Sequence, residues 1–495
     1  MKKTLKKSLC FLLTLVMLLS IATTAFAKTN KTPVILVHGL GANHVYENIG
    51  TEDQAEIENL GLGDIASTIF QNKAIINEVV KMLDPDRKTN RKKLIDSLAK
   101  VIGKDNAINC TKNGNIKKGQ GVINYWTTPL SKHKDYWQNA DVAEAAIARQ
   151  LCKTNGAKNV YCFNYDWRQD VCKTAKDLNK YIKIIKKKTG AKKVSVIGCS
   201  LGGAVLSAYI DAYAKQKDLK TAVFVNPAIG GVDVARAFAL DLTINRKSVL
   251  NYLKCMETAF NGGELQGLFK AAGIFGDVRI GYLADYLSTF VKNKKSVKQL
   301  YMKVLKPWIG NIPSLWECVP YDSFDAAVNK MSKMGFLDKK SGLYKKIKKY
   351  HGVQGRFNKN IKALKKSGVE VAIFASYGTM GIPLTSKVNN QTDALIDTKY
   401  ASAGATVANY GKKLKASGKY VSNDKAINAK TCALPNNTWF LKDVQHMRFY
   451  FGSDATKLVA NIACGNVKAN IKAVKKKYKK GQFLAEVNRK LVTVW

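Results

Sequence analysis

A serine stands among glycines in "VIGCSLGGA", which runs from Val196 to Ala204. The apolar run before Ser200 predicts a buried strand, and the text after it predicts a helix, so the serine falls on a sharp strand-to-helix turn. Side chains at Gly198 and Gly202 would crowd such a turn, which presents the serine hydroxyl at its tip as a nucleophile. The alternative is a plain tight turn, because the five-residue pattern also arises by chance. The flanking strand and helix favour the nucleophile.

A serine nucleophile needs a general base, and that base follows the serine in chains with this turn motif. Of the five histidines, only His351 and His446 come after Ser200. His351 lies in the basic stretch "KKIKKYHGVQGRF", where we expect an exposed side chain. His446 follows the strand-like run "TWFLKDVQ", so a loop would carry it to the carboxyl edge of the sheet. We therefore predict His446 as the base; the alternative is a partly buried structural histidine.

The base needs an orienting acid. Asp393 and Asp397 both follow the predicted strand at residues 368–378. Either could orient the histidine, and either could instead cap a turn or a helix. Asp443 stands only three residues before His446, so we assign it to the structure of that loop.

The charge that develops on a substrate carbonyl oxygen needs preformed donors. The backbone N–H of Leu201, directly after the serine, is one candidate. The loop "VHGLGA" at residues 37–42 follows the first predicted strand, and its glycines let the backbone turn the N–H of Leu40 inward as the second. A plain turn is the alternative for this loop.

Alternating strand and helix signals must position these residues. We expect strands at residues 32–39, 159–167, 192–198 and 220–231, with helices at 139–158, 170–190 and 202–216 between them. This order predicts right-handed βαβ units and a mainly parallel sheet covered by helices on both faces. Strand patterns return at 368–378 and 438–449.

The breaks in this rhythm predict the domain organisation. We expect an α/β core in two parts, residues 28–231 and 358–495, with a lysine-rich loop insertion at 43–134 and a basic helix in the tail after Asn466. Residues 232–357 are predicted to form a helical cap. Its stretch at 260–291 combines apolar side chains with glycines, which favours a mobile lid; a static helical subdomain is the alternative. The apolar side chains are Phe260, Leu265, Leu268, Phe269, Ile274, Phe275, Leu283, Leu287 and Phe290.

The N-terminus has the pattern of an export signal. Four lysines precede an apolar run that ends in Ala25-Phe26-Ala27, and we expect cleavage after Ala27. An uncleaved anchor is the alternative. We see no later apolar run of spanning length and expect a secreted, soluble chain. Of the ten cysteines, nine remain after cleavage, so at least one is unpaired in a monomer.

The chain is strongly basic, with a formal net charge of +45 over 495 residues. Such a surface attracts anionic partners such as phospholipid headgroups, although a merely solvated surface explains it equally well. No zinc-finger spacing or nucleic-acid-binding aromatic motif is present, so we expect no nucleic-acid partner. We identify no metal-ligand cluster and expect no cofactor.

The motifs resemble those of secreted lipases of the α/β-hydrolase superfamily. "LVHGLG" (36–41) and "GCSLGG" (198–203) are similar to the matching motifs of bacterial triacylglycerol lipases. "FNYDWR" (163–168) and "NIPSLWECVP" (311–320) resemble stretches of the lecithin:cholesterol acyltransferase and lysosomal phospholipase A2 group. Cys199 departs from the histidine usual in those families, and the insertion near Asn43 has no counterpart.

The resemblance implies an α/β-hydrolase fold with a cap, and ester hydrolysis on lipid. "TDALI" is similar to the turn that carries the acid in many secreted lipases, which favours Asp393 over Asp397, although Ala394 replaces the common glycine. We therefore predict a secreted lipase or esterase with the triad Ser200, Asp393 and His446, acting at an anionic lipid interface. A phospholipase or acyltransferase, or an inactive cell-surface binding relative, remains the alternative. For Asp166 and Arg168 we expect a loop-stabilising ion pair or hydrogen bond, and no catalytic role.

Overall fold

A computed structural model describes residues 31–57, 72–82, 88–102, 107–123, 125–139, 144–259, 277–384, 390–446, 454–478, 481–488 and 490–494. The expected export signal at residues 1–27 lies outside these ranges. Six of the apolar residues named for the lid, Phe260 to Phe275, lie outside them as well.

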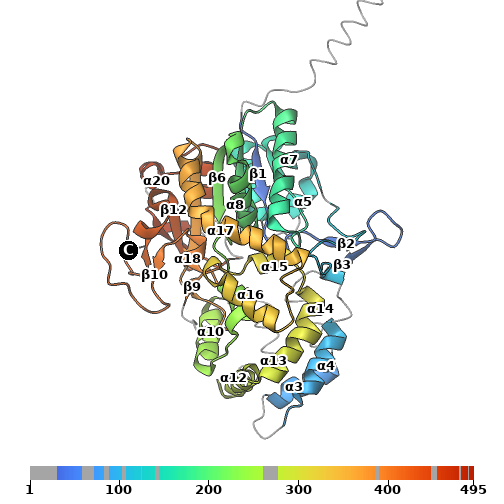
Figure 1. The fold of residues 1–495 in the computed structure, drawn as a ribbon. Coiled ribbons are helices and arrows are strands. Elements are labelled where there is room, and N and C mark those ends of the chain that lie inside the picture. Colours follow the sequence, from blue (N-terminus) through green and yellow to red (C-terminus); the bar gives the residue numbers. More distant parts are fainter. Residues whose placement is uncertain are drawn as a thin grey trace, which may run out of the picture.

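An eight-stranded sheet forms the centre of the molecule (Figure 1). Its strands run in the order β4, β1, β5, β6, β7, β12, β13 and β14, and all neighbours are parallel except the last pair. Their bounds are Val160–Phe163, Val34–Val37, Val194–Cys199, Leu219–Val225, Glu370–Tyr377, Thr438–Lys442, Phe483–Val487 and Lys490–Thr493. The predicted parallel sheet is confirmed, and this strand order with its crossover helices is the α/β-hydrolase fold.

Helices cover both faces of the sheet. On one face, helices α7 (Val171–Thr189), α8 (Leu201–Tyr213) and α17 (Gly342–Lys366) pack into a common apolar core with the strands. On the other face lie α6 (Ala145–Asn155) and α19 (Asp454–Ala463). Every residue of β1, β4 and β5 is buried. Continuous apolar runs are typical of strands in a sheet that is covered on both faces.

The C-terminal tail differs from the sequence prediction. A basic helix, α20, occupies Ile471–Tyr478 as expected, but the chain then forms the antiparallel hairpin of β13 and β14, which extends the sheet beyond β12. The edge of the sheet on this side is therefore formed by β13 and β14, which follow the helix.

The described part of the insertion between β6 and β7 consists mainly of helices. We call residues 233–333 the cap: α9 (Asp233–Arg236), α10 (Arg246–Ala259), α12 (Asp277–Lys292), α13 (Lys294–Leu300), α14 (Lys306–Ile309), α15 (Pro313–Glu317) and α16 (Phe324–Lys333). Two π-helical segments, Ala237–Asp241 and Tyr301–Leu305, interrupt it. Helix α17 then runs through the predicted boundary at residue 357 and packs on α8 as part of the core.

The described parts of the lysine-rich insertion after β1 contain short helices and a hairpin. They form the hairpin of β2 (Val45–Glu47) and β3 (Ala55–Ile57) and the helices α3 (Lys73–Met82), α4 (Arg91–Ile102) and α5 (Lys134–Asn139). Helices α3 and α4 lie beside α12 and α13 of the cap, as Figure 1 shows, and share small apolar clusters with them. Helices α3 and α4 thus form one region with the cap, at the same end of the molecule.

The eight cysteines whose side chains the structure describes all carry free thiols. Among the described residues, none of the helices combines the length and the apolar character needed to cross a bilayer.

Candidate active site

Ser200 sits on the predicted strand-to-helix turn, between β5 and α8. Its backbone has φ 52° and ψ −120°, a conformation that is strained for any residue with a side chain. A Cβ on Gly202 would lie 2.2 Å from the carbonyl oxygen of Val37, and one on Gly198 would lie 2.6 Å from that of Gly202. The flanking glycines are therefore required by close backbone approach, as the sequence predicts.

Three predicted site residues come together at the carboxyl edge of the sheet. His446 follows β12, and its Nε2 lies 3.1 Å from Ser200 Oγ. Its Nδ1 lies 2.6 Å from Oδ2 of Asp393, which follows β7. All three side chains are buried. The backbone N–H of His446 also donates to the Asp393 carbonyl oxygen at 2.6 Å, so the two loops are fixed to each other.

Asp393 has the geometry of an orienting acid because its second oxygen is already occupied. Oδ1 accepts the backbone N–H groups of Leu395 at 3.0 Å and Ile396 at 2.6 Å, which leaves Oδ2 directed at His446. Ala394 adopts φ 79° within this turn, a left-handed conformation that favours glycine.

Asp397 lies in the same loop, but its side chain bonds to the start of the cap. Its Oδ2 accepts the backbone N–H of Asp233 at 2.8 Å, and its Oδ1 accepts Asn390 Nδ2 at 2.8 Å. Burial and the neighbouring Asp233 raise the pKa of Asp397 to about 6. Asp397 thus ties the start of α9 to the sheet, and the structure separates the two candidate acids by their contacts.

The two remaining candidates occupy structural positions. Asp443 has φ 58°, and its N–H donates to the Tyr377 carbonyl oxygen at 2.7 Å, so it turns the chain after β12. His351 is half-buried on α17 and stacks on Phe324 and Tyr321, with ring centroids 4.1 Å and 5.0 Å away. The expectation of an exposed His351 is wrong, because aromatic side chains from the end of the cap cover it.

The loop after β1 lies against the serine. A Cβ on Gly39 would lie 2.9 Å from Ser200 Cβ and 3.4 Å from Ser200 Oγ. Leu40 follows it, with a partly exposed side chain, and Leu201 is the first residue of α8, so its N–H has no carbonyl partner within that helix. The loop that carries Leu40 and the backbone N–H of Leu201 thus both lie next to Ser200.

His38 holds this loop in place as a neutral residue. Burial lowers the pKa of His38 to about 4. Its Nε2 faces the Asn43 amide nitrogen at 2.8 Å and accepts the Tyr165 N–H at 3.2 Å, and its ring stacks on Tyr165. The hydroxyl of Tyr165 donates to the His38 carbonyl oxygen at 2.9 Å. Tyr165, which follows the neighbouring strand β4, therefore helps to hold the loop after β1 in position.

Asp166 and Arg168 form the expected ion pair, with 2.7 Å between Oδ2 and Nη2. Arg168 is completely buried and also donates to the Ile108 carbonyl oxygen at 3.1 Å and to Gln120 Oε1 at 3.0 Å. The pair therefore anchors the insertion after β1 to the core.

Sequence reasoning missed one ionisable group, Glu144. It stands at the start of α6 and is buried beside the loop after β1, where its Oε1 accepts the Gly39 N–H at 2.6 Å. Burial raises the pKa of Glu144 to about 7. Its only sequence signal was an acidic residue within an apolar helical pattern, and such a residue is usually exposed.

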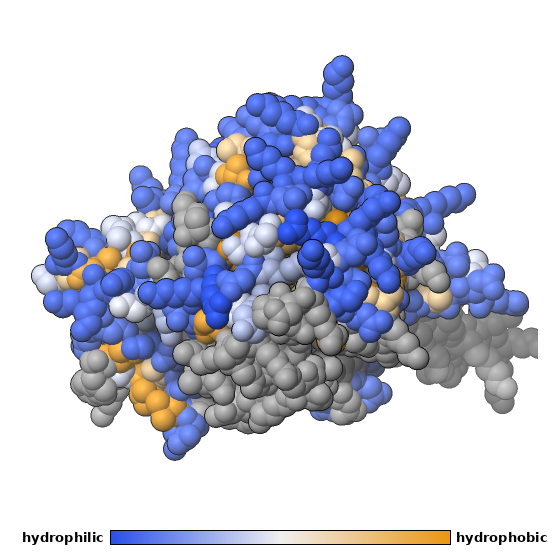
Figure 2. All heavy atoms as spheres, turned by 90° about the horizontal axis from the view of Figure 1, so that it is seen from below, coloured by the Kyte–Doolittle hydropathy of each residue, from blue (hydrophilic) through white to orange (hydrophobic). Residues whose placement is uncertain are grey.

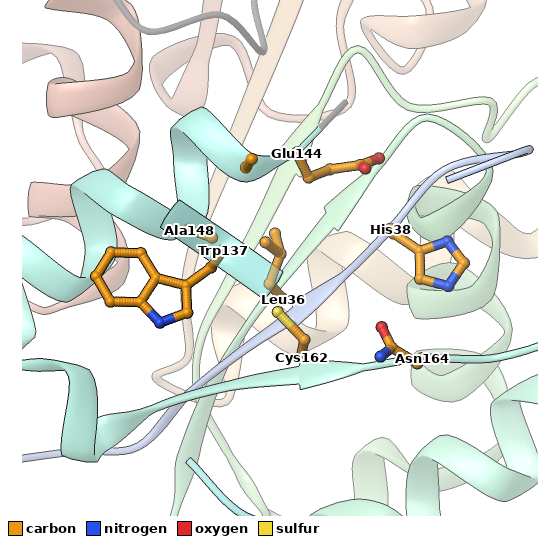
Figure 3. Close-up of a pocket in the computed structure, with 8 residues that line it drawn as sticks. Leu36, His38, Trp137, Glu144, Ala148, Cys162 and Asn164 are labelled. Atoms are coloured by element: carbon orange, nitrogen blue, oxygen red, sulfur yellow. The ribbon is translucent and has the colours of Figure 1, made fainter. Parts of the chain in front are cut away.

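A small pocket lies behind this loop. Its cavity volume is only about 10 Å³, and Figure 3 shows Leu36, His38 and Glu144 around it, with Trp137, Ala148, Cys162 and Asn164. The lining is apolar except for the two polar ends, Glu144 and His38 with Asn164. Among the described residues, no group of three His, Cys, Asp or Glu side chains could hold a metal ion.

The comparisons with known proteins yield distant likeness only. No family model matches the chain, and no curated protein matches it. The phospholipase PlaB from Legionella pneumophila aligns at 11% identity and a TM-score of 0.23, over 59% of this chain and 43% of that one. A Tle4–Tli4 complex aligns at 11% identity and a TM-score of 0.33, over 87% and 98%. The chain spans less than half the length of that phospholipase, and identities this low speak to the fold alone.

Proposed function

We propose that this protein is a serine hydrolase of lipid carboxylic esters. The observation that carries the proposal is the continuous line of contacts from Asp393 through His446 to Ser200. Its two distances, 2.6 Å and 3.1 Å, lie within the range in which an acid orients a base and a base activates a nucleophile.

The proposed reaction proceeds through an acyl-enzyme. Ser200 Oγ attacks the ester carbonyl carbon while His446 Nε2 takes its proton, and Asp393 stabilises the imidazolium through Nδ1. The N–H groups of Leu201 and Leu40 bind the oxyanion. The imidazolium then protonates the leaving alcohol, and the C–O bond breaks. Water, activated by the same histidine, attacks the acyl-enzyme and releases the carboxylic acid and free Ser200.

Two features support a lipid ester as the substrate. Leu40 and Leu395, next to the oxyanion loop and the acid, each expose more than a third of an apolar side chain. The net charge of +45 favours an anionic interface, and exposed lysines on the cap helices α12 and α13 supply part of it: Lys292, Lys294, Lys295 and Lys298. Figure 2, which views the molecule from below, shows a mostly hydrophilic surface with scattered hydrophobic patches.

A substrate panel tests this function. Purified protein should hydrolyse triacylglycerol emulsions and p-nitrophenyl esters, and Ser200→Ala should lose activity by several orders of magnitude while keeping the fold. A preference for phospholipid vesicles would favour the phospholipase or acyltransferase alternative, which the positive charge supports. Absence of hydrolysis on every ester would favour a binding protein.

The proposal includes export and removal of residues 1–27. N-terminal sequencing of the protein from the culture medium should begin at Lys28. Recovery of an intact Met1 terminus with the membrane fraction would favour an uncleaved anchor instead.

A further inference from the structure

Glu144 is a buried acid that the proposed reaction does not use. Only 4% of its surface is exposed, although it lies at the start of α6 beside the active-site loop. Its Oε1 accepts the Gly39 N–H at 2.6 Å, while its Oε2 has no hydrogen-bond partner among the residues that the structure describes. A buried acid with one oxygen unpartnered is costly, so its position calls for a role.

The carboxyl group and the Ser200 hydroxyl flank the same small space. A Cβ on Gly39 would lie 3.2 Å from Glu144 Oε1 and 3.4 Å from Ser200 Oγ. In Figure 3 the Glu144 side chain reaches from α6 across the pocket, on the side of His38. The residue after Gly39 is Leu40, whose N–H is the proposed second donor to the oxyanion.

We infer that Glu144 is a positioning residue for the oxyanion loop: by accepting the Gly39 N–H, its carboxylate fixes the backbone that presents the Leu40 amide to the substrate oxygen. This role rests on the proposed function, because it acts through a donor that matters only in the transition state. A hydrogen bond to an ionised acceptor is about twice as strong as a neutral one, so the ionised form holds the loop best.

The surroundings of Glu144 make its ionisation relevant near neutral pH. Burial raises its pKa to about 7, and the bond from Gly39 opposes that shift. The titratable groups that face it are His446, His38, Tyr165, Cys162 and Cys199. Of these, only His446 gains charge during the reaction, and an ionised Glu144 attracts the imidazolium that forms there.

The sign of the pH effect follows from Glu144. As pH falls through about 7, Glu144 becomes protonated, which weakens its bond to the Gly39 N–H. In Glu144→Gln the amide oxygen still accepts the Gly39 N–H but does not titrate. The ratio of wild-type kcat to Glu144→Gln kcat should therefore be highest above pH 7 and fall towards 1 as the pH drops to 5.

A matched control exists in the cap. Glu317 on α15 is equally buried, and its Oε2 accepts the Val171 N–H at 2.9 Å beside Asp170. Burial raises its pKa strongly as well. Because it does not contact the active-site loop, Glu317→Gln removes a comparable buried acid without touching the proposed role.

The experiment measures kcat and KM for a p-nitrophenyl ester from pH 5 to 9 in the wild type and three variants. Glu144→Ala should lower kcat about 100-fold with KM within about threefold, the size expected for misplacing one oxyanion donor. Glu144→Gln should keep kcat within about tenfold at pH 8, and the ratio of wild-type kcat to its kcat should approach 1 at pH 5. Glu317→Gln should keep the wild-type kcat at every pH.

Three results would overturn the role of Glu144: wild-type kcat in Glu144→Ala, a ratio of wild-type to Glu144→Gln kcat that does not change with pH, or a ratio that rises as Glu144 becomes protonated. If Glu144→Ala does not fold, the pH dependence of that ratio decides alone. Ser200→Ala separates this role from the proposed function. If Ser200→Ala is inactive and Glu144→Ala keeps wild-type activity, only the positioning role of Glu144 is overturned. If Ser200→Ala remains active, the proposed function is overturned as well.

Discussion

The catalytic edge of the sheet and the outer part of the cap are built differently. Ser200 and His446 each follow a strand whose residues belong to the large apolar clusters of the core, and backbone bonds tie the loops of His446 and Asp393 together. The base of the cap, around α15 and α16, has a cluster of twelve buried side chains, whereas its outer helices and the insertion beside it are held by smaller clusters. Two of these contain three buried side chains each, drawn from α3, α4, α12 and the π-helical segment at Tyr301–Leu305.

The polar contacts differ in the same way. Buried bonds of 2.6–3.1 Å fix the catalytic side chains. In the outer part of the cap and in the insertion beside it, Arg246 pairs with Asp285 and Lys303 with Asp96 through largely exposed side chains, and such pairs contribute little. Arg236, at the base of the cap, instead forms a buried pair with Asp233. Segments with few buried contacts open at low free energy, so we propose that the outer part of the cap rearranges while its base and the triad stay in place.

The largest expected effect separates the two aspartates of one loop. Asp393→Asn should lower kcat about 10⁴-fold, because the histidine loses its orienting acid. Asp397→Asn should cost less than about tenfold, because an asparagine oxygen can still accept the Asp233 N–H. Steady-state kinetics on a p-nitrophenyl ester gives the ranking, and the reverse order would move the acid to Asp397.

The next effect concerns the cap at an interface. If the cap rearranges there, the rate should rise more than about tenfold when the substrate passes from dissolved monomer to emulsion or vesicle. Simple saturation through that transition would indicate a fixed, open pocket.

Charge should contribute to the same step. Salt should weaken binding to anionic vesicles more than to neutral ones. Replacing Lys294, Lys295 and Lys298 on α13 by Glu should reduce binding to anionic vesicles, while the same change at Lys183, Lys187 and Lys192, in or just after α7, serves as the control. Equal losses in the two triple variants would show that net charge, and no particular face, sets the affinity.

The smallest expected effect lies in the acid loop. Ala394 adopts φ 79°, so Ala394→Gly should relieve strain and raise the free energy of unfolding by about 1 kcal/mol. Ala401→Gly, in the helical turn of α18 (Thr398–Ala401), should instead lower it by a similar amount. Urea unfolding measures both; destabilisation in both variants would mean that the turn does not strain Ala394.

The sheet and the serine turn could be predicted because their signals are local. Largely apolar runs mark β1, β5 and β6, and the serine turn has a recognisable pattern of glycines within six residues. The close contact that requires Gly198 is with the nearby Gly202, whereas the one that requires Gly202 is with Val37 on the neighbouring strand. The hairpin of β13 and β14 was missed because the preceding lysine-rich helix pattern was extended to the end of the chain. Each of its strands has a single buried residue, Leu484 and Leu491, which is weak evidence over four or five residues.

The choice between Asp393 and Asp397 could not be made from the residues alone. Both are buried acids in one loop, and their roles differ only through partners far away in sequence, His446 and Asp233. Glu144 was missed for the same reason: nothing near it in the chain indicates that it meets Gly39, 105 residues earlier.

The most direct measurement of the central claim is covalent labelling with a fluorophosphonate ester. The native protein should take up one label per chain, on Ser200, and peptide mass spectrometry should find it in the peptide that contains "GCSLGG". His446→Ala should label at least about 1,000-fold more slowly, because the hydroxyl loses its base. A label on another residue, or equal labelling rates in the wild type and His446→Ala, would contradict the account.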